Sequence, residues 1–109
     1  EKIIGISTHS IEQAIEAEQG GASYIGFGPI FHTKTKDAGE PKGIEMLKEV
    51  KRHIKIPVIA IGGINIENLR SVIDSGADAV AVSSAIIQGD IAENITCFLK
   101  VLYRENQII

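Results

Sequence analysis

The sequence predicts an α/β protein in which parallel strands alternate with helices that cover the sheet. Three observations carry this prediction: short runs dominated by apolar residues, amphipathic stretches that follow each of them, and an internal repeat. The composition agrees, because 44% of the 109 residues are hydrophobic but only 5% are aromatic. Small and β-branched residues of this kind suit the strands of a buried parallel sheet.

The predicted elements alternate along the whole chain. Four apolar runs are the predicted strands, at Ile3–Ile6, Tyr24–Gly28, Pro57–Ile61 and Asp78–Val82. Four stretches with apolar residues three or four positions apart are the predicted helices, at Ile11–Gln19, Ile44–Ile54, Ile66–Ser75 and Ile91–Tyr103. Ser10, with Gln13 three residues on, and Asn65 are typical helix caps, whereas Gly20 and Gly76 are typical helix ends.

The chain repeats itself after 55 residues. This shift aligns Gly5-Ile6 with Ala60-Ile61, Ser10–Glu12 with Asn65–Glu67, and Tyr24–Phe27 with Ala79–Val82. A two-strand unit present twice predicts half of a (β/α)₈ TIM barrel, with four strands and four helices, as one domain over residues 1–109. Four strands cannot close a barrel, so we expect a missing N-terminal half or a second copy of the chain to complete it. The alternative is a small flavodoxin-like open sheet that is complete at this length.

Charge and hydropathy exclude several kinds of partner. The net charge is −3 and no cluster of Lys or Arg stands out, which argues against nucleic-acid binding. No apolar stretch approaches the roughly 20 residues that span a bilayer, so no membrane is expected. The single cysteine, Cys97, lies among apolar residues and is predicted to be a buried thiol, which fits a cytoplasmic location.

Two pairs of small residues at strand ends predict a phosphate site. Gly62-Gly63 follows the third predicted strand, and Ser83-Ser84 follows the fourth. In a parallel sheet both pairs would present backbone N–H groups at the same edge, where phosphate binds in βα folds. Each pair also has a plainer explanation, because glycines make tight turns and serines cap helices.

A long polar loop after the second strand is the other candidate. It spans Pro29–Lys42, in which Thr33, Lys34, Thr35 and Lys36 supply hydroxyl donors and positive charge for an anionic ligand. On composition alone, a solvated connector explains the loop equally well.

The remaining polar residues give weaker indications. His9 precedes a helix cap and is predicted to be a hydrogen-bonded structural residue more than a catalytic base. His32 and His53 lack partners at metal-ligand spacing and are expected at the surface. Three acidic residues show no convincing partner in the sequence: Asp37, Glu40 and Asp78.

Four segments together resemble thiamine phosphate synthase. They are Gly5-Ile-Ser-Thr-His-Ser10, Gly28-Pro-Ile-Phe-His-Thr-Lys-Thr-Lys36, Ala60-Ile-Gly-Gly-Ile64 and Gly76-Ala-Asp-Ala-Val-Ala-Val-Ser-Ser-Ala-Ile86. The second segment is the specific one, whereas the last two are shared with many phosphate-binding barrels. The resemblance implies a (β/α)₈ barrel that joins hydroxymethylpyrimidine diphosphate to thiazole phosphate and releases pyrophosphate, with Mg²⁺ on the diphosphate.

The same resemblance implies roles for individual residues. Ser7 and Lys36 would hold the departing pyrophosphate, and Lys36 would neutralise the charge that develops on it. The residues implied to contact the thiazole phosphate and cradle its phosphate group are Thr33, Lys34, Thr35, Gly63, Ser83 and Ser84. The family's first half supplies a Gln-x-Arg-x-Lys segment and two Asp ligands for Mg²⁺, and these have no counterpart in this chain. The isolated chain is therefore expected to bind phosphate without completing the reaction.

Two alternative functions stay open at this point. Thiazole tautomerase is a related barrel in which a His at the position of His9 acts as acid and base, although that reaction has little use for Lys36 as a diphosphate ligand. A non-catalytic phosphate-binding half-barrel would account for the missing Mg²⁺ ligands.

Overall fold

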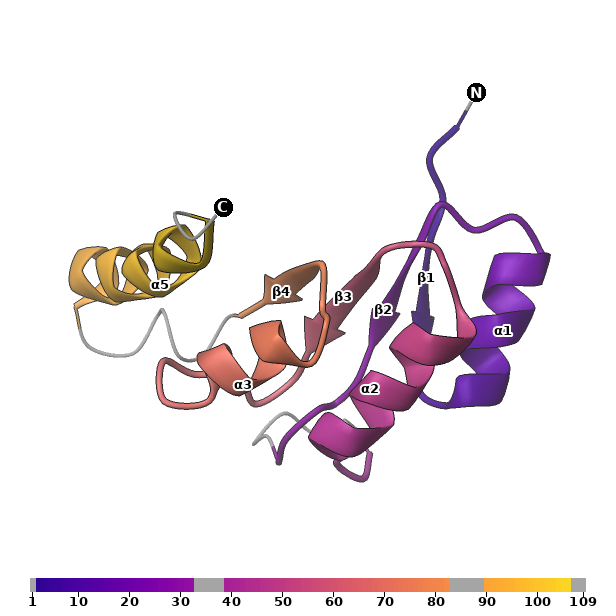
Figure 1. Ribbon diagram of the computed structural model, residues 1–109, viewed down its shortest axis with the longest axis horizontal. Helices are drawn as coiled ribbons and strands as arrows, with labels where there is room; N and C mark the ends of the chain where they lie inside the picture. The colour runs from indigo at the N-terminus through magenta and orange to yellow at the C-terminus, as the bar shows by residue number, and fades with distance from the viewer. Residues whose placement is uncertain (1, 33–38, 83–89, 107–109) are drawn as a thin grey trace.

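The computed structural model describes residues 2–32, 39–82 and 90–106. Strands and helices alternate through these ranges (Figure 1). The elements are β1 (Gly5–Thr8), α1 (Ile11–Gln19), β2 (Tyr24–Phe27), α2 (Gly43–His53), β3 (Val58–Ile61), α3 (Leu69–Asp74), β4 (Ala79–Ala81) and α5 (Ile91–Asn106). The predicted alternation of strand and helix is confirmed.

The four strands form one parallel sheet in the order β1-β2-β3-β4. Each strand pairs with the next one along the chain, and each connection contains a helix. Because such crossovers are almost always right-handed, a sheet built in one direction carries its helices on one face. A flavodoxin-like fold reverses its strand order and has helices on both faces, so that alternative is wrong.

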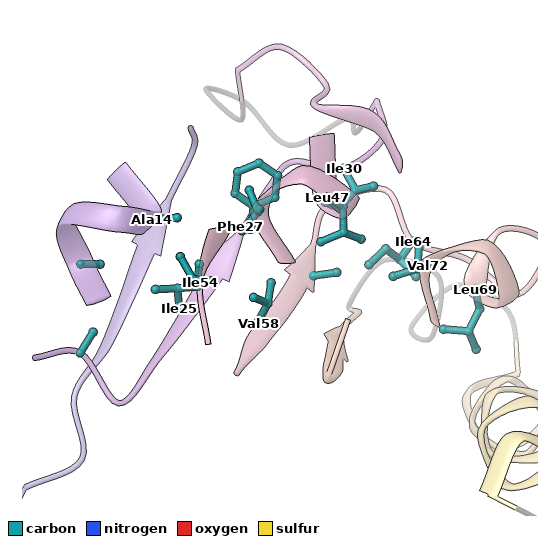
Figure 2. Packing of buried hydrophobic residues seen from close by; sticks show 14 residues of the cluster. Ala14, Ile25, Phe27, Ile30, Leu47, Ile54, Val58, Ile64, Leu69 and Val72 are labelled. Atoms are coloured by element: carbon teal, nitrogen blue, oxygen red, sulfur yellow. The ribbon is translucent and has the colours of Figure 1, made fainter. Parts of the chain in front are cut away.

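The hydrophobic core lies between the helices and one face of the sheet. Alternate strand residues point toward the helices, and Ile25, Phe27, Val58 and Ala60 are fully buried there. The helices contribute small and branched residues at helical spacing, namely Ala14, Ala17, Leu47, Val50, Leu69 and Val72. Figure 2 shows this cluster as a band between helices and sheet that reaches from Ala14 of α1 to Leu69 of α3.

The opposite face of the sheet carries mostly small residues, and we call it the open face. Its residues are Gly5, Ser7, Tyr24, Gly26, Ile59, Ile61, Ala79 and Ala81. Ile61 bends over Gly26, yet 39% of its surface stays exposed. In a closed (β/α)₈ barrel this face would point into the interior, which is filled by side chains from all strands.

The first and third predicted strand–helix units differ from the structure at their boundaries. β1 runs from Gly5 to Thr8 instead of Ile3 to Ile6, because Gly5 is the first residue that pairs with β2. Ser7 and Thr8 therefore belong to the strand and not to the loop after it. α3 begins at Leu69, three residues later than predicted, and the residues before it form turns that Asn65 caps.

The last helix has apolar residues that do not face the core. α5 lies beyond β4, at the opposite end of the molecule from α1 (Figure 1). Along one side, Ile91, Ile95 and Leu99 are 49%, 40% and 42% exposed. Cys97 is also exposed, so the prediction of a buried thiol is wrong. Its apolar neighbours Ile95 and Leu99 belong to this partly exposed side of the helix.

The amino ends of the strands are held by side chains that follow the repeat. Ser23 donates its N–H to the Ile4 carbonyl and accepts from the Ile4 N–H through Oγ. Asp78, 55 positions later, does the same with Val58 through its carboxylate. These reciprocal pairs begin β2 and β4 in the same way.

Asp78 also has a charged partner, which corrects the prediction that it had none. Its Oδ2 accepts from Lys51 Nζ at 2.7 Å. Partial burial by itself raises the pKa of the Asp78 carboxyl, but the hydrogen bonds from Lys51 and Val58 and the charge of Lys51 outweigh it and leave the pKa below its ordinary value. Because it ties the amino end of the sheet together, this group has a structural role.

Candidate functional site

The carboxyl edge of the sheet brings several predicted site residues together. Ser7 and His9 lie at the end of β1, and Gly62-Gly63 follows β3. The other predicted site residues lie outside the described residues: Thr33, Lys34, Thr35, Lys36, Ser83 and Ser84. The described residues at this edge form the base of the candidate site.

Ser7 lies on the open face, beside Gly26 of β2. Its pairing with Gly26 leaves an exposed hydroxyl next to a residue without a side chain. The next residue, Thr8, points the other way and is buried, where its hydroxyl donates to the Gly26 carbonyl at 2.8 Å. Thr8 therefore stabilises the β1–β2 pair, and Ser7 is the β1 hydroxyl that a ligand on the open face could reach.

His9 is tied at both its backbone and its ring. Its N–H donates to Gln13 Oε1 at 2.8 Å, while Ser10 Oγ accepts from the Gln13 N–H at 3.1 Å, so Ser10 and Gln13 cap α1 as predicted. The His9 Nδ1 lies 2.8 Å from the carbonyl oxygen of Gly28. Because a carbonyl only accepts, Nδ1 carries the proton in this contact and Nε2 is left to other partners.

The loops after β2 and β3 approach each other so closely that only glycine fits. A Cβ on Gly28 would lie 2.1 Å from the Ile61 oxygen, and one on Gly62 would lie 2.7 Å from Pro29 Cα. Two backbone hydrogen bonds join the loops, from Ile30 N–H to the Ile61 carbonyl at 2.9 Å and from Phe31 N–H to the Gly62 carbonyl at 3.1 Å. The glycine pair thus has a packing function that its sequence position did not reveal.

Gly63 keeps a feature that an anion site needs. Its φ is +69°, and a Cβ there would lie 2.6 Å from the His32 oxygen. No hydrogen bond between described residues uses the N–H of Gly62 or Gly63. Backbone donors of this kind, turned out at the carboxyl edge of a parallel sheet, are the groups that bind phosphate oxygens.

Two asparagines fix the loop that holds Gly63. Asn65 Oδ1 accepts from the Asn68 N–H at 3.0 Å, and Asn68 Oδ1 accepts from the Asn65 N–H at 2.8 Å. Asn68 also donates its side-chain amide to the Gly63 carbonyl at 3.0 Å. The sequence indicated only Asn65, although the Asn-x-x-Asn spacing matches a reciprocal capping box.

The loop that carries Thr33–Lys36 begins and ends at fixed points. Lys42 N–H donates to the Pro29 carbonyl at 2.7 Å, and Gly43 N–H donates to the Ile30 carbonyl at 2.8 Å. These bonds hold the residues that end the loop against the residues that begin it. The segment between them therefore stands on a base that is also joined to β3.

The described residues do not fit a metal site. No group of three His, Cys, Asp or Glu side chains in residues 2–32, 39–82 and 90–106 could hold an ion. His32 and His53 are exposed, as predicted. Among the helices of the described part, none is long and apolar enough to cross a membrane.

Comparison with known proteins identifies the family to which such an edge belongs. The family model described as thiamine monophosphate synthase matches residues 1–86. The thiamine-phosphate synthase of Clostridium acetobutylicum is 51% identical over 87 residues, which is 80% of this chain and 41% of that protein. The one from Pyrococcus horikoshii is 46% identical over 103 residues, covering 94% of this chain and 50% of that protein.

A solved structure agrees with the sequence comparisons. The thiamine phosphate pyrophosphorylase of Pyrococcus furiosus superposes with a TM-score of 0.85 at 41% identity. The match covers 94% of this chain and 49% of that one. The chain thus spans about half the length of the curated relatives it matches, and its four parallel strands and their helices correspond to half of a barrel, as predicted.

Proposed function

This chain belongs to the thiamine monophosphate synthase family, and from that premise we propose that residues 1–109 are the carboxyl-terminal half-barrel of a thiamine phosphate synthase. In this proposal the half-barrel holds the thiazole phosphate and the departing pyrophosphate of the condensation. The hydroxymethylpyrimidine diphosphate reacts at its methylene carbon, where the bond to pyrophosphate breaks and the bond to the thiazole nitrogen forms. A cytoplasmic location, with Cys97 as a free thiol, is part of the proposal.

The observation that carries the proposal is the edge formed by Gly62 and Gly63. Their N–H groups donate to no described residue, and they lie beside the base of the loop that carries Lys36. Gly63, Ser83 and Ser84 are proposed to bind the phosphate group of the thiazole substrate. Thr33, Lys34 and Thr35 are proposed to contact the rest of that substrate.

The departing pyrophosphate is assigned to Ser7 and Lys36. Ser7 is exposed on the open face, from which its hydroxyl can donate to an oxygen of the pyrophosphate. Lys36 is proposed to neutralise the negative charge that grows on the pyrophosphate as the bond breaks. This lowers the free energy of the transition state of the condensation. Since the described residues do not fit a Mg²⁺ site, the ligands for the ion are assigned to the other half of the barrel.

The other half of the barrel is the partner that this proposal requires. β1 and β4 are the outer strands of the described sheet, and the open face carries exposed Ile61. Four more strands would pair with both outer strands and cover this face. Either an N-terminal half of the same family or a second copy of this chain could supply them. The mass of the purified 109-residue chain in solution, measured by light scattering, separates these cases: a dimer supports the second copy, and a monomer or a polydisperse aggregate supports the separate half.

The function itself is tested by co-expressing this chain with the amino-terminal half of the Clostridium acetobutylicum relative. Formation of thiamine phosphate from the two substrates with Mg²⁺ is the readout. We expect activity in the mixture and a loss of at least about a hundredfold for Lys36→Ala, the usual scale for removing one charge-stabilising group. Lys55→Ala removes the same charge from an exposed position and serves as the matched control.

The rival functions give different patterns in the same experiment. Thiazole isomerisation that depends on His9 and survives Lys36→Ala would indicate a tautomerase. Binding of thiazole phosphate without either reaction would indicate a non-catalytic half-barrel. Either result would contradict the synthase proposal.

A further inference from the structure

His9 contacts a backbone atom that the functional loop depends on. The distance from its Nδ1 to the Gly28 carbonyl oxygen is 2.8 Å. Within the described residues, His9 is the one side chain that hydrogen-bonds to the backbone of residues 28–32. Gly28 is buried and its N–H donates to the Thr8 carbonyl at 3.3 Å, so one of its backbone groups is held by β1 and the other by the residue that follows β1.

The Gly28 carbonyl lies at the start of a chain of contacts that ends at the anion site. Directly after it, Ile30 and Phe31 donate to the Ile61 and Gly62 carbonyls, and Gly63 packs against His32 and Phe31. The backbone that begins the loop after β2 is therefore fixed relative to the Gly62-Gly63 turn. A shift at Gly28 would move both.

We propose that His9 is a positioning residue, whose Nδ1–H holds the Gly28 carbonyl and thereby keeps the loop after β2 against the Gly62-Gly63 turn. This inference deepens the proposed function, on which its phosphate-binding part rests. The backbone from which the ring projects is fixed, because the His9 N–H donates to Gln13 and the neighbouring Ser10 caps α1.

Three variants of His9 separate positioning from acid–base chemistry. His9→Asn keeps a donor close to the place of Nδ1 but exchanges no proton near neutral pH. His9→Gln moves the donor toward the place of Nε2, and His9→Ala removes it. Positioning requires that Asn restores what Ala loses and that Gln does not.

The first measurement is amide hydrogen exchange of the full chain at Ile30 and Phe31, which needs no substrate. We expect His9→Ala to speed exchange there at least about fivefold, the factor that corresponds to one neutral hydrogen bond, and His9→Asn to restore it. The N–H of buried Ile25, which donates to the Pro57 carbonyl near the start of β2, reports overall unfolding. Equal acceleration at Ile25 would show a general loss of stability and overturn the proposal, as would unchanged exchange at Ile30.

The second measurement is binding of inorganic phosphate, followed by the amide resonances of Gly62 and Gly63 at several pH values. We expect His9→Ala to weaken binding about fivefold or more and His9→Asn to bind like the original chain with the same pH profile. If Asn and Ala lose binding equally, Nε2 is the important atom and positioning is refuted. If the original chain binds no phosphate, the proposed function fails, whereas the exchange measurement still decides the role of His9.

Discussion

The two central strands of the sheet bury their core-facing side chains more completely than the two outer strands do. In β2 and β3, the core-facing residues Ile25, Phe27, Val58 and Ala60 are fully buried. In β1 the corresponding Ile6 is 40% exposed, and in β4 the corresponding Val80 is only partly buried. The central strands bury these core-facing side chains completely, whereas each outer strand leaves a core-facing side chain partly exposed, where another chain segment could cover it.

The same contrast holds for the loops at the carboxyl edge. The loops after the central strands share backbone hydrogen bonds and leave no room for a Cβ at Gly28 or Gly62. At the edge, the segment that follows β1 reaches these loops through the ring of His9, which contacts the Gly28 carbonyl. The difference teaches that the loops after the two central strands form the base of the anion site, and that the ring of His9 is the contact by which the edge bears on it.

The largest expected effect comes from truncating the central core. Phe27→Ala should lower the free energy of unfolding by about 3 to 5 kcal/mol, because it leaves a cavity among fully buried neighbours. Ile6→Ala, at the edge, should cost about 1 kcal/mol or less, since the side chain is partly in water already. Chemical denaturation of both variants measures the difference. Equal losses would mean that β1 is as buried in solution as β2, through a partner.

A close second is the glycine contact between the central loops. Gly62 and Gly21 have φ values of +99° and +96°, so alanine at either position carries the same backbone cost of about 1 to 2 kcal/mol. A Cβ on Gly21 meets nothing within 4 Å, whereas one on Gly62 meets Pro29 backbone at 2.7 Å. Gly62→Ala should therefore be less stable than Gly21→Ala by about 1 to 3 kcal/mol in denaturant unfolding. Two variants of equal stability would show that the loops separate easily.

The amino end of the sheet should show a smaller, pH-dependent effect. The pKa of Asp78 is lowered in the folded chain, so its ionised form stabilises the fold above the unfolded pKa of about 3.9. That contribution is lost as the pH falls from about 5 through the folded pKa, because the proton then binds the unfolded chain more readily. Since the carboxylate is 45% exposed, we expect about 1 kcal/mol or less from the ion pair.

Asp78→Asn isolates this contribution. The variant should lose less stability than the original chain between pH 5 and 3, as measured by thermal unfolding across that range. Glu45→Gln breaks an exposed pair with Lys48 and serves as the control, which should leave the pH dependence unchanged. Parallel pH curves for the original chain and Asp78→Asn would contradict the assignment.

The smallest effect is expected on α5. Ile95→Ser changes a side chain that is 40% exposed, and it should alter the free energy of unfolding of the monomer by less than about 0.5 kcal/mol. If the chain associates, the same change should weaken the association, measured by light scattering over a range of concentrations. A large loss of monomer stability would place Ile95 in the core.

Local spacing explains what the sequence predicted well. Ser10 and Gln13 are three residues apart, so their cap on α1 could be predicted without knowing the rest of the fold. The repeat predicted the half-barrel architecture for a similar reason, since it compares the chain only with itself. The closure of Gly62 onto Pro29 was not predictable, because the two are brought together by β2 and β3 pairing.

The predictions that were wrong depended on contacts between segments far apart in the sequence. Cys97 was predicted to be buried because its neighbours are apolar, but burial depends on what covers α5 and not on the helix itself. Asp78 looked unpartnered because Lys51 lies 27 positions away, on α2. The contact of His9 with Gly28 likewise spans 19 positions and joins two strand ends.

The outer strands β1 and β4 have one further consequence, for how copies of this chain would assemble. The two edges are different surfaces, so pairing β4 of one copy with β1 of the next leaves the same two edges available again. Such head-to-tail contacts form a closed ring when the rotation between copies returns to the start, and a growing fibre when it does not. The curvature of a four-stranded sheet, more than the strength of its edge contacts, thus determines whether concentrated protein stays in small rings or polymerises.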